Sequence, residues 1–484
     1  MPESRGAARL ILYGATIFLS AFLLFLIQPI FAKLILPWFG GSSAVWTTCL
    51  VFFQTALLAG YLYAHLLTRP WMHAALLAVA LLVLPVLPGE RWKPSGAGDP
   101  AWQILAMLTV VLGLPYFLLS ATSPLLQKWL AREGAEPYRL FALSNVGALL
   151  ALAAYPIWIE PRSATRAQDV GWSAGFAVFA VLCAVAASLA KPSVIVKETT
   201  PARGSAIPWL LLAAAGSMLL VSTTNQLTQN VAAVPFLWIL PLAVYLLSFI
   251  ICFESPRWYQ RGLFLRLLAV TLASLAYALY DIQVSEAIPV AIPLFTIGLF
   301  IACMFCHGEL SRLKPQTSQL TSFYLMIALG GALGTIFTGL IAPHIFAGIY
   351  EFPLSLSFVA ALALWLNFNG GWAQRLLWAA VTVAMILALA EEVRGYHKDT
   401  LVMTRSFYGS LRVVESFRGG GKARTLYHGI VQHGAQYLDP AKRDEPTTYF
   451  GPQSGAGLTL RFCCEGPKRV GIIGLGAGTL AAYG

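Results

Sequence analysis

The chain has 484 residues, of which 58% are hydrophobic and only 11% are charged. Because soluble domains carry nearer about 25% charged residues, this composition excludes an ordinary soluble protein and predicts a lipid bilayer as the main partner. The net charge of +11 comes from basic residues scattered in short loops between apolar runs. That pattern is typical of membrane topology signals, so we expect no nucleic-acid partner.

Apolar runs of roughly 17–25 residues predict membrane-spanning helices. The first follows Arg5 and Arg9 without a small-residue cleavage site, so we expect an uncleaved span. The third, twelfth and thirteenth are short, and a re-entrant or interfacial piece is the alternative for each. The thirteen expected spans cover about 9–31, 45–67, 72–88, 102–122, 138–158, 171–190, 207–223, 235–253, 263–280, 288–306, 321–345, 351–367 and 374–391.

Basic residues are distributed unequally between alternate loops. Fifteen Lys and Arg residues fall on the side of the N-terminus and five on the other side. The positive-inside rule therefore places the N-terminus in the cytoplasm. Thirteen crossings would then put the C-terminal part outside the cell, so either one short span is false or that part is not a cytoplasmic enzyme.

Two stretches of the chain resemble each other at an offset of roughly 185 residues. Residues 124–156 and 307–343 each carry a basic amphipathic loop, an aromatic entry, a stripe of small residues and a closing proline. The offset divides the first twelve spans into six plus six, one way in which transporters are built. The alternative is that small residues and proline recur in any bundle because they pack helices.

Several polar residues lie within the apolar runs, where they are candidates for a functional cavity. They are Gln28, Lys33, Asn145, Asn225, Gln226, Gln229 and Asn230. Hydrogen bonding between helices is the alternative role. For Gly330, Gly331 and Gly334 we expect a close helix crossing rather than a ligand loop.

The tenth span closes on Cys303-Met-Phe-Cys306-His307, which matches the C-x-x-C-H haem-attachment pattern. The predicted topology places His307 on the cytoplasmic side, where covalent haem attachment is not expected. We therefore interpret the motif as two buried thiols and an interfacial histidine. The other cysteines lie mostly in apolar segments and predict no disulfide framework.

The character of the chain changes after about residue 392. Short segments typical of strands follow at 406–416, 423–439 and 458–464, which predicts a small antiparallel β unit. The run Val470-Gly-Ile-Ile473 predicts a buried parallel strand, and Thr479 begins a short helix. Strand, glycine turn and helix together predict the first unit of an α/β core. The expected domains are thus 1–392 (transmembrane helices), 393–468 (small β unit) and 469–484 (start of the α/β core).

Glycines occupy every second position of the turn, at Gly474, Gly476 and Gly478. A dinucleotide fingerprint counted from Gly474 would have Gly or Ala at 479, where Thr stands. The spacing G-x-G-x-G fits better the first loop of folds that bind S-adenosylmethionine or its relatives. A glycine-rich turn without a ligand is the alternative. Since such a core needs further strands, we expect the chain to be part of a longer protein.

Four C-terminal motifs resemble those of spermidine synthases, the aminopropyltransferases. They are FYGSLRV (407–413), GIVQ (429–432), RDE with a following tyrosine (443–449) and the glycine loop (470–478). Together with the apolar first part, the chain resembles bacterial fused membrane and spermidine synthase-like proteins. The resemblance implies a bacterial inner-membrane protein whose C-terminal part begins a methyltransferase-like domain.

The resemblance also implies roles for individual residues. Gln432 and Tyr449 would contact the donor, decarboxylated S-adenosylmethionine, or the amine, putrescine. Gly474, Gly476 and Gly478 would pass beneath the adenosyl group. Ala477 departs from the family, which usually has Asp there, and the family's catalytic Asp loop would lie beyond Gly484. No catalytic residue, metal or resident cofactor is therefore assigned.

Two functions remain open at this point. The first is aminopropyl transfer in polyamine synthesis, in which a neutral amine attacks the carbon beside a sulfonium and a carboxylate takes the proton. The second is a transporter-like membrane protein whose C-terminal domain binds an adenosyl or amine ligand without catalysis. The second predicts polar groups facing one cavity between the two sets of six helices. A membrane scaffold with neither feature is a third possibility.

Overall fold

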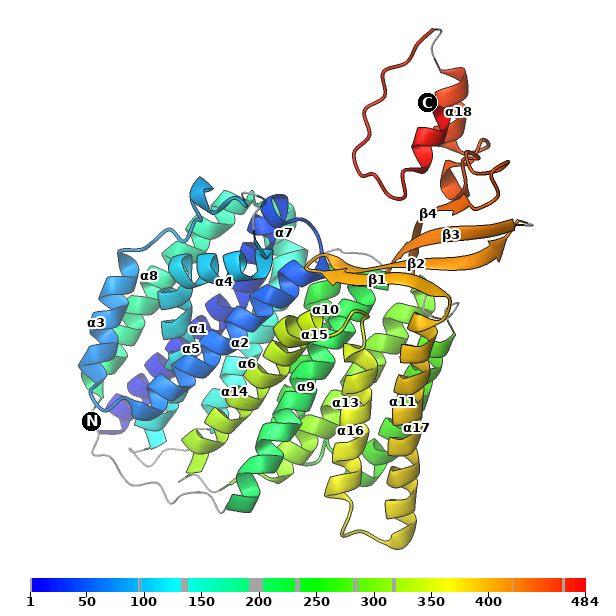
Figure 1. Ribbon diagram of the computed structural model, residues 1–484. Coiled ribbons are helices and arrows are strands. Elements are labelled where there is room, and N and C mark those ends of the chain that lie inside the picture. The colour runs from blue at the N-terminus through cyan, green and yellow to red at the C-terminus, as the bar shows by residue number, and fades with distance from the viewer. Residues whose placement is uncertain are drawn as a thin grey trace. The chain divides into compact units, whose positions relative to one another are not determined.

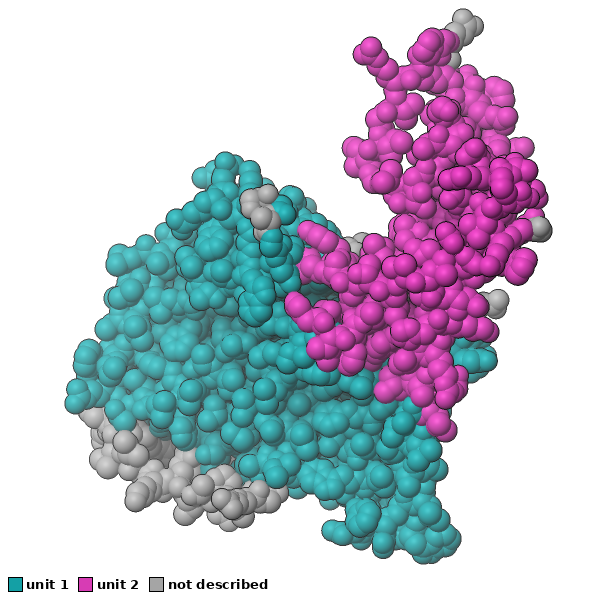
Figure 2. All heavy atoms as spheres, viewed as in Figure 1, with its two compact units in different colours: residues 1–342, 351–386 teal, residues 343–350, 387–484 magenta. Residues whose placement is uncertain are grey.

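The structure is a computed structural model that describes residues 2–94, 96, 98–131, 138–190, 203–230, 236–281, 284, 287–315, 319–419, 421–463 and 466–484. Some residues of the sequence analysis lie outside the described part. They are Arg132, Lys191 and Lys197, which were counted among the basic loop residues, and the side chain of Asn230. The chain forms two compact units, marked in Figure 2. A membrane unit comprises residues 1–342 and 351–386, and a C-terminal unit comprises residues 343–350 and 387–484.

The membrane unit consists of helices that coincide with the predicted apolar runs (Figure 1). The first part contains α1 (Pro2–Phe39), α2 (Ser43–Leu66), α3 (Pro70–Leu81), η1 (Glu90–Trp92), α4 (Pro100–Val111), α5 (Gly113–Ala131), α6 (Tyr138–Ala154), η2 (Tyr155–Ile159), α7 (Glu160–Arg162) and α8 (Thr165–Leu189). The second contains α9 (Arg203–Asn230), α10 (Phe236–Glu254), α11 (Arg261–Tyr280), α13 (Ile288–Arg312), α14 (Leu320–Ile336), η4 (Phe337–Ile341), α15 (Ala342–Ile345) and α16 (Glu351–Leu366). The helix α17 (Trp372–His397) follows.

Among the described residues, ten helices are long and apolar enough to cross a membrane, and one bent pair makes an eleventh. A polytopic helical bundle is thus confirmed, while the expected number of thirteen full spans is not. Two of the expected spans, α3 and α16, are shorter than a bilayer crossing requires. The α3 helix stops at Leu81 instead of 88, since Pro85 disfavours helix at the residue before it.

The expected span at 102–122 was wrong as a single helix. The structure divides it into α4 and α5, which meet at 71°. Pro115 has no N–H to donate to Val111, and Gly113 weakens the helix at the same point. The second piece then continues to Ala131, which places residues 120–127 deeper in the bundle than the sequence predicted.

The helices of the first and second parts form an N-terminal half and a C-terminal half, and the pattern of contacts in one half repeats in the other. In the N-terminal half, α1 packs on α6 and α2 packs on α5; in the C-terminal half, α9 packs on α14 and α10 packs on α13. Contacts between the halves are also reciprocal, because α2 packs on α14 while α10 packs on α6. Both α6 and α14 pass into a π-helical turn, η2 and η4, at matching places. The two halves are therefore packed alike, whereas a repeat of six plus six membrane spans stays a prediction.

Gly330 and Gly334 of α14 form the expected close crossing, whereas Gly331 lines a cavity described below. A Cβ on Gly330 would lie 2.3 Å from the Leu210 carbonyl oxygen, and one on Gly334 would lie 2.4 Å from that of Ala214. The N-terminal half has a counterpart in α6, where a Cβ on Gly147 would lie 2.8 Å from the Phe18 carbonyl oxygen. Small residues at these positions let helix backbones approach closely in both halves.

The C-terminal unit contains a four-stranded antiparallel sheet in the order β1-β2-β3-β4. The strands are β1 (Thr400–Ser406), β2 (Gly409–Arg418), β3 (Gly421–His428) and β4 (Val431–Tyr437). Gly429 has a φ of +60° in the two-residue turn between β3 and β4, a conformation that favours glycine. The small β unit is thus confirmed, whereas the domain boundaries at 392 and 468 stay predictions.

Two expectations for the last fifty residues were wrong. The segment predicted as a strand at 458–464 is mostly helix, α18 (Gly455–Phe462), which is capped by the Ser454 hydroxyl accepting from the Gly457 N–H at 3.0 Å. Residues 470–473 form no strand, and the Ile473 side chain is fully exposed. A parallel strand needs hydrogen-bonded neighbours and two covered faces, and the described residues supply neither. The short helices η5 (Thr448–Phe450) and η6 (Thr479–Tyr483) complete the unit.

Candidate functional site

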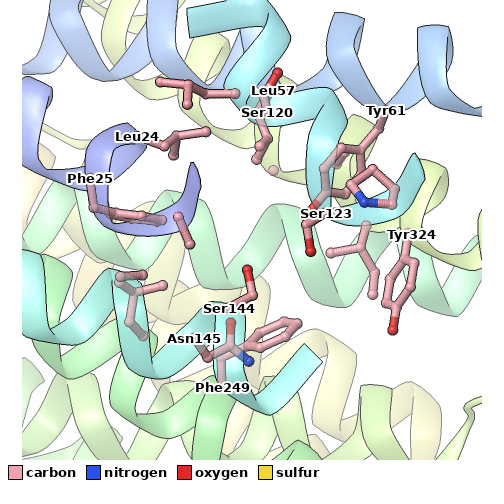
Figure 3. Close-up of a pocket in the computed structure, with 18 of the residues that line it drawn as sticks. Leu24, Phe25, Leu57, Tyr61, Ser120, Ser123, Ser144, Asn145, Phe249 and Tyr324 are labelled. Atoms are coloured by element: carbon pink, nitrogen blue, oxygen red, sulfur yellow. The ribbon is translucent and has the colours of Figure 1, made fainter. Parts of the chain in front are cut away.

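A cavity of about 150 Å³ lies between the two halves of the membrane unit (Figure 3). Its walls come from α1, α2, α5 and α6 of the N-terminal half and from α10 and α14 of the C-terminal half. The pairs α2 with α10 and α6 with α14 occupy equivalent places in the two halves, so each half contributes the same two helices to the cavity wall. A cavity of this volume can hold a molecule about the size of benzene.

Polar and aromatic side chains divide the cavity wall between them. The serines and amides of the described wall come from the N-terminal half: Ser20, Gln54, Ser120, Ser123, Gln127, Ser144 and Asn145. Five rings complete the wall: Phe25, Tyr61, Tyr245, Phe249 and Tyr324. Figure 3 shows Ser123, Asn145 and Tyr324 facing the same space from three different helices. This mixture of rings and a few polar groups is typical of small-molecule sites.

Gln127 is a deeply buried amide of the wall, with 3% of its surface exposed. Its side-chain N–H donates to the Ser123 hydroxyl at 3.0 Å, and its Oε1 accepts no hydrogen bond from the described residues. The adjacent Lys128 turns away, because its Nζ donates to the carbonyl oxygens of Ala64 at 3.1 Å and His65 at 2.8 Å near the end of α2. Gln127 therefore presents a buried acceptor beside the cavity without a charge next to it.

A layer of buried contacts joins the halves at the end where α2 and α10 begin. The rings of Trp46 and Trp238 stack with centroids 5.6 Å apart, and both side chains are almost fully buried. Thr47 Oγ1 donates to Asn225 Oδ1 at 2.8 Å, and a Cβ on Gly339 of η4 would lie 2.8 Å from the Thr47 methyl group. We call these residues (Trp46, Thr47, Asn225, Trp238 and Gly339) the interhalf seal. The first cavity residue on α2 is Gln54, about 10 Å further along the helix.

Of the intramembrane polar residues predicted from the sequence, Asn145 lines the cavity. Gln28 donates to the Tyr116 hydroxyl at 3.2 Å, and Lys33 forms an ion pair with Glu160. Asn225 belongs to the seal, and Gln229 donates to the Ser43 hydroxyl at 3.3 Å, so this polar patch joins helices rather than facing the cavity.

The C-x-x-C-H motif lies inside the bundle on α13. Cys303 and Cys306 are fully buried free thiols, and His307 is fully buried rather than interfacial as expected. Its Nδ1 shares a hydrogen bond of 3.0 Å with the Ser248 hydroxyl, and its ring packs against Tyr245 and Phe249. His307 thus supports two rings of the cavity wall from behind.

Sequence analysis missed most of the cavity wall. Gln54 is the one strongly polar residue in a long apolar stretch of α2, a signal that would have identified it. Ser120, Ser123 and Gln127 recur at helical spacing on α5, and the assumed straight span ended at 122 and so hid this stripe. No motif in the sequence predicts the five rings as a group.

The structure brings some of the predicted C-terminal site residues together. The N–H of Ala477 donates to the His433 carbonyl oxygen at 3.1 Å, so the glycine turn lies against β4 beside Gln432. Gly474, Gly476 and Gly478 all have positive φ, at +89°, +57° and +74°. Gln432 Oε1 accepts from Arg418 at 2.8 Å. Tyr449 lies in η5 with half of its surface exposed and packs against Phe450.

Comparison with known proteins adds little to this picture. No family model matches the chain, and no curated protein matches it by sequence. Among solved structures, the crystal structure of a mutant of the nucleoside transporter NupG is similar over 79% of this chain and 99% of its own, with 10% identity and a TM-score of 0.42. A likeness this low supports no conclusion about function, so the site has to be interpreted from its own geometry.

Proposed function

We propose that the membrane unit is a carrier that moves a small solute across the bilayer through the cavity between its two halves. The observation that carries this proposal is the position of the cavity: it lies between two similarly packed halves, and two pairs of equivalent helices line it. Binding sites at the interface of structural repeats are a common feature of secondary transporters, in which one half rocks against the other. The interhalf seal would then be the contact that opens when the solute leaves at the end of the bundle where α2 and α10 begin.

Transport by the purified full chain in proteoliposomes tests this proposal. Uptake of radiolabelled D-ribose, myo-inositol and uracil is compared with uptake by empty liposomes. A double variant, Thr47→Cys with Asn225→Cys, gives a matched control because oxidation would link the two sides of the seal. We expect the cross-linked protein to lose uptake and to regain it on reduction. Equal uptake in the linked and reduced states would contradict a rocking carrier.

A second proposal concerns the C-terminal unit, which we infer to bind an adenosyl or amine ligand. It is supported by the placement of the glycine turn against β4, next to Gln432. Calorimetric titration of the full chain with methylthioadenosine and with putrescine tests it. Gln432→Ala should weaken binding about tenfold, while Gln436→Ala on the same strand should not. Unchanged affinity in Gln432→Ala would exclude the proposed site.

Aminopropyl transfer from decarboxylated S-adenosylmethionine to putrescine is the finer version of this proposal. It requires that Tyr449 and the three glycines meet one ligand, and it predicts spermidine as a product. Formation of spermidine in a mixture of donor, amine and protein is the test.

The cytoplasmic N-terminus is likewise a prediction, and a reporter that is active only in the cytoplasm, fused after residue 395, would show on which side the C-terminal unit lies.

A further inference from the structure

We infer that the cavity is selective for uncharged, ring-shaped solutes that carry a hydrogen-bond donor, and that Gln127 is the residue that receives this donor. The inference rests on the proposed carrier function and adds the chemical class of the solute to it. Three observations carry it: the absence of charge from the described wall, the unpaired acceptor of Gln127, and the rings that line the cavity.

Charge is the first criterion of selectivity. None of the described residues that line the cavity is Asp, Glu, Lys, Arg or His. An ion that entered such a cavity would lose its hydration without gaining a counter-ion, which costs several kcal/mol. Amides and hydroxyls can replace the water around a neutral polar solute at much lower cost. A free polyamine, which needs acidic walls, is therefore excluded as the solute of this cavity.

Shape is the second criterion. Phe25 and Tyr61 face the cavity from the N-terminal half, while Tyr245, Phe249 and Tyr324 face it from the C-terminal half. Rings on opposite sides favour a flat or ring-shaped molecule, whose faces they can cover by stacking or edge contacts. His307 holds two of these rings in place by packing against Tyr245 and Phe249, with centroid distances of 4.7 and 4.9 Å.

Polarity at the edge of the solute is the third criterion. The Gln127 side chain is fixed by its hydrogen bond to Ser123, which leaves its Oε1 as a buried acceptor. A buried acceptor without a partner is costly, so a solute N–H or O–H that reaches it gains more than it would at the surface. Asn145 offers a second amide from α6, across the cavity from α5.

Three probes of nearly equal shape separate these criteria: benzamide is neutral, benzamidine is a cation and benzoate is an anion. Ligand-detected NMR with the purified full chain in detergent measures their binding. We expect benzamide to bind at least tenfold more tightly than either ion. Gln127→Leu should weaken benzamide binding by about tenfold. Gln103→Leu, a change of the same kind on α4 outside the cavity, should leave it unchanged.

A carboxylate placed in the wall should change the selectivity. We expect Gln127→Glu to favour benzamidine over benzamide, and Asn145→Asp provides a second placement if the first variant does not fold. Equal binding of all three probes, tighter binding of an ion to the natural chain, or no binding of benzamide would each overturn the inference. Benzamide binding without solute uptake in proteoliposomes would reject the carrier function and keep the assigned ligand class, so the two failures are distinguishable.

Discussion

In the N-terminal half of the membrane unit, α5 turns Ser120, Ser123 and Gln127 toward the cavity. In the C-terminal half, α13 takes the equivalent place in the packing but sends no side chain to the cavity wall among the residues described. Its polar side chains are instead bonded to neighbouring helices: His307 to Ser248, and Glu309 to a cluster around it. The two halves are packed alike, but their equivalent helices differ in role: α5 lines the cavity, whereas α13 bonds to its neighbouring helices.

The Glu309 cluster shows what the C-terminal half does with its charges. The Glu309 carboxylate is 4% exposed and accepts from the Tyr259 hydroxyl at 2.8 Å, from Arg261 at 2.9 Å and from Arg312 at 3.1 Å. Arg261 also donates to the Leu366 carbonyl oxygen at 3.2 Å, which links α11, α13 and the end of α16. The comparison teaches that the N-terminal half supplies the amides and serines of the described cavity wall, while the C-terminal half supplies three of its five rings and is braced by an ion-pair network around a buried carboxylate.

The largest effect that this comparison predicts is on stability, through Glu309→Ala. Removing the carboxylate leaves Arg261 and Arg312 without their common partner and the buried Tyr259 hydroxyl without its acceptor. Because the two arginine side chains are 31% and 51% exposed and keep part of their hydration, we expect a loss near the lower end of the about 3–5 kcal/mol that breaking a fully buried ion pair costs. Gln127→Leu, on the equivalent helix, should change stability much less because no charge is left unpaired. The fraction of protein that stays monodisperse in detergent after heating measures both.

Glu90→Ala is the matched control for this experiment, since Glu90 pairs with Lys93 on an exposed loop. We expect it to behave like the natural chain. If Glu309→Ala were as heat-resistant as Glu90→Ala, the two halves would not differ in the way proposed.

The close helix crossings allow a graded comparison of the halves. Gly330→Ala adds a Cβ 2.3 Å from a backbone oxygen, and Gly147→Ala adds one at 2.8 Å, so both helix pairs must separate. We expect losses of about 1–3 kcal/mol, with the larger loss for Gly330→Ala in the C-terminal half. Thermal unfolding in detergent gives the order. Gly171→Ala on α8 is the control, because its Cβ meets nothing within 4 Å and alanine favours helix.

The membrane helices could be predicted from the sequence because the signal is local. A run of apolar residues about 20 long fixes a helix wherever its neighbours lie. Even so, the bend between α4 and α5 was missed, since the effect of Gly113 and Pro115 depends on which neighbours satisfy the freed carbonyls. That error hid Gln127, a deeply buried amide of the cavity wall.

The cavity and the glycine turn could not be predicted for a different reason. Six helices from both halves contribute to the cavity, and which face of each helix turns inward is decided by packing between distant segments. Likewise, the pattern around Val470 is compatible with a buried strand, but a strand forms only with partners, and the described residues provide none. Gln432 and Gly476 lie in one region, whereas a shared ligand for them stays a prediction.

The interhalf seal gives a prediction of intermediate size. Thr47→Val removes the hydrogen bond to Asn225 and leaves a buried amide oxygen without its donor, so it should favour separation of the halves by about 1 kcal/mol, or about fivefold. Cys49, a fully buried thiol less than one turn beyond Thr47, reports this opening by its rate of alkylation. Cys183 on α8 is the internal control, and mass spectrometry distinguishes the two. Equal acceleration at both cysteines would indicate general loosening instead of a gate.

The smallest predicted effect sharpens the contrast between buried and exposed ion pairs. Like Glu309, Glu415 on β2 faces two cations, Lys422 and Arg424 on β3, but at the solvent-exposed surface of the sheet. The hydrogen bond from Lys422, aided by that from Arg424, holds the pKa of Glu415 below its ordinary value of 4.5. A lowered pKa adds stability above the unfolded-state value, and this contribution is lost as the pH falls through the folded-state value.

Glu415→Gln should therefore loosen the β2–β3 pairing slightly at pH 7 and should not differ from the natural chain in acid well below pH 4.5. Hydrogen–deuterium exchange measures this difference. At each pH, the exchange rates of the β2 and β3 amides in the natural chain are subtracted from those in the variant. Solvent screening keeps the effect small, far below that of Glu309→Ala. A difference that persisted unchanged in acid would mean that the Glu415 charge does not act through Lys422 and Arg424. An effect as large as that of Glu309→Ala would mean that burial is not what makes the C-terminal half of the membrane unit depend on its ion pairs.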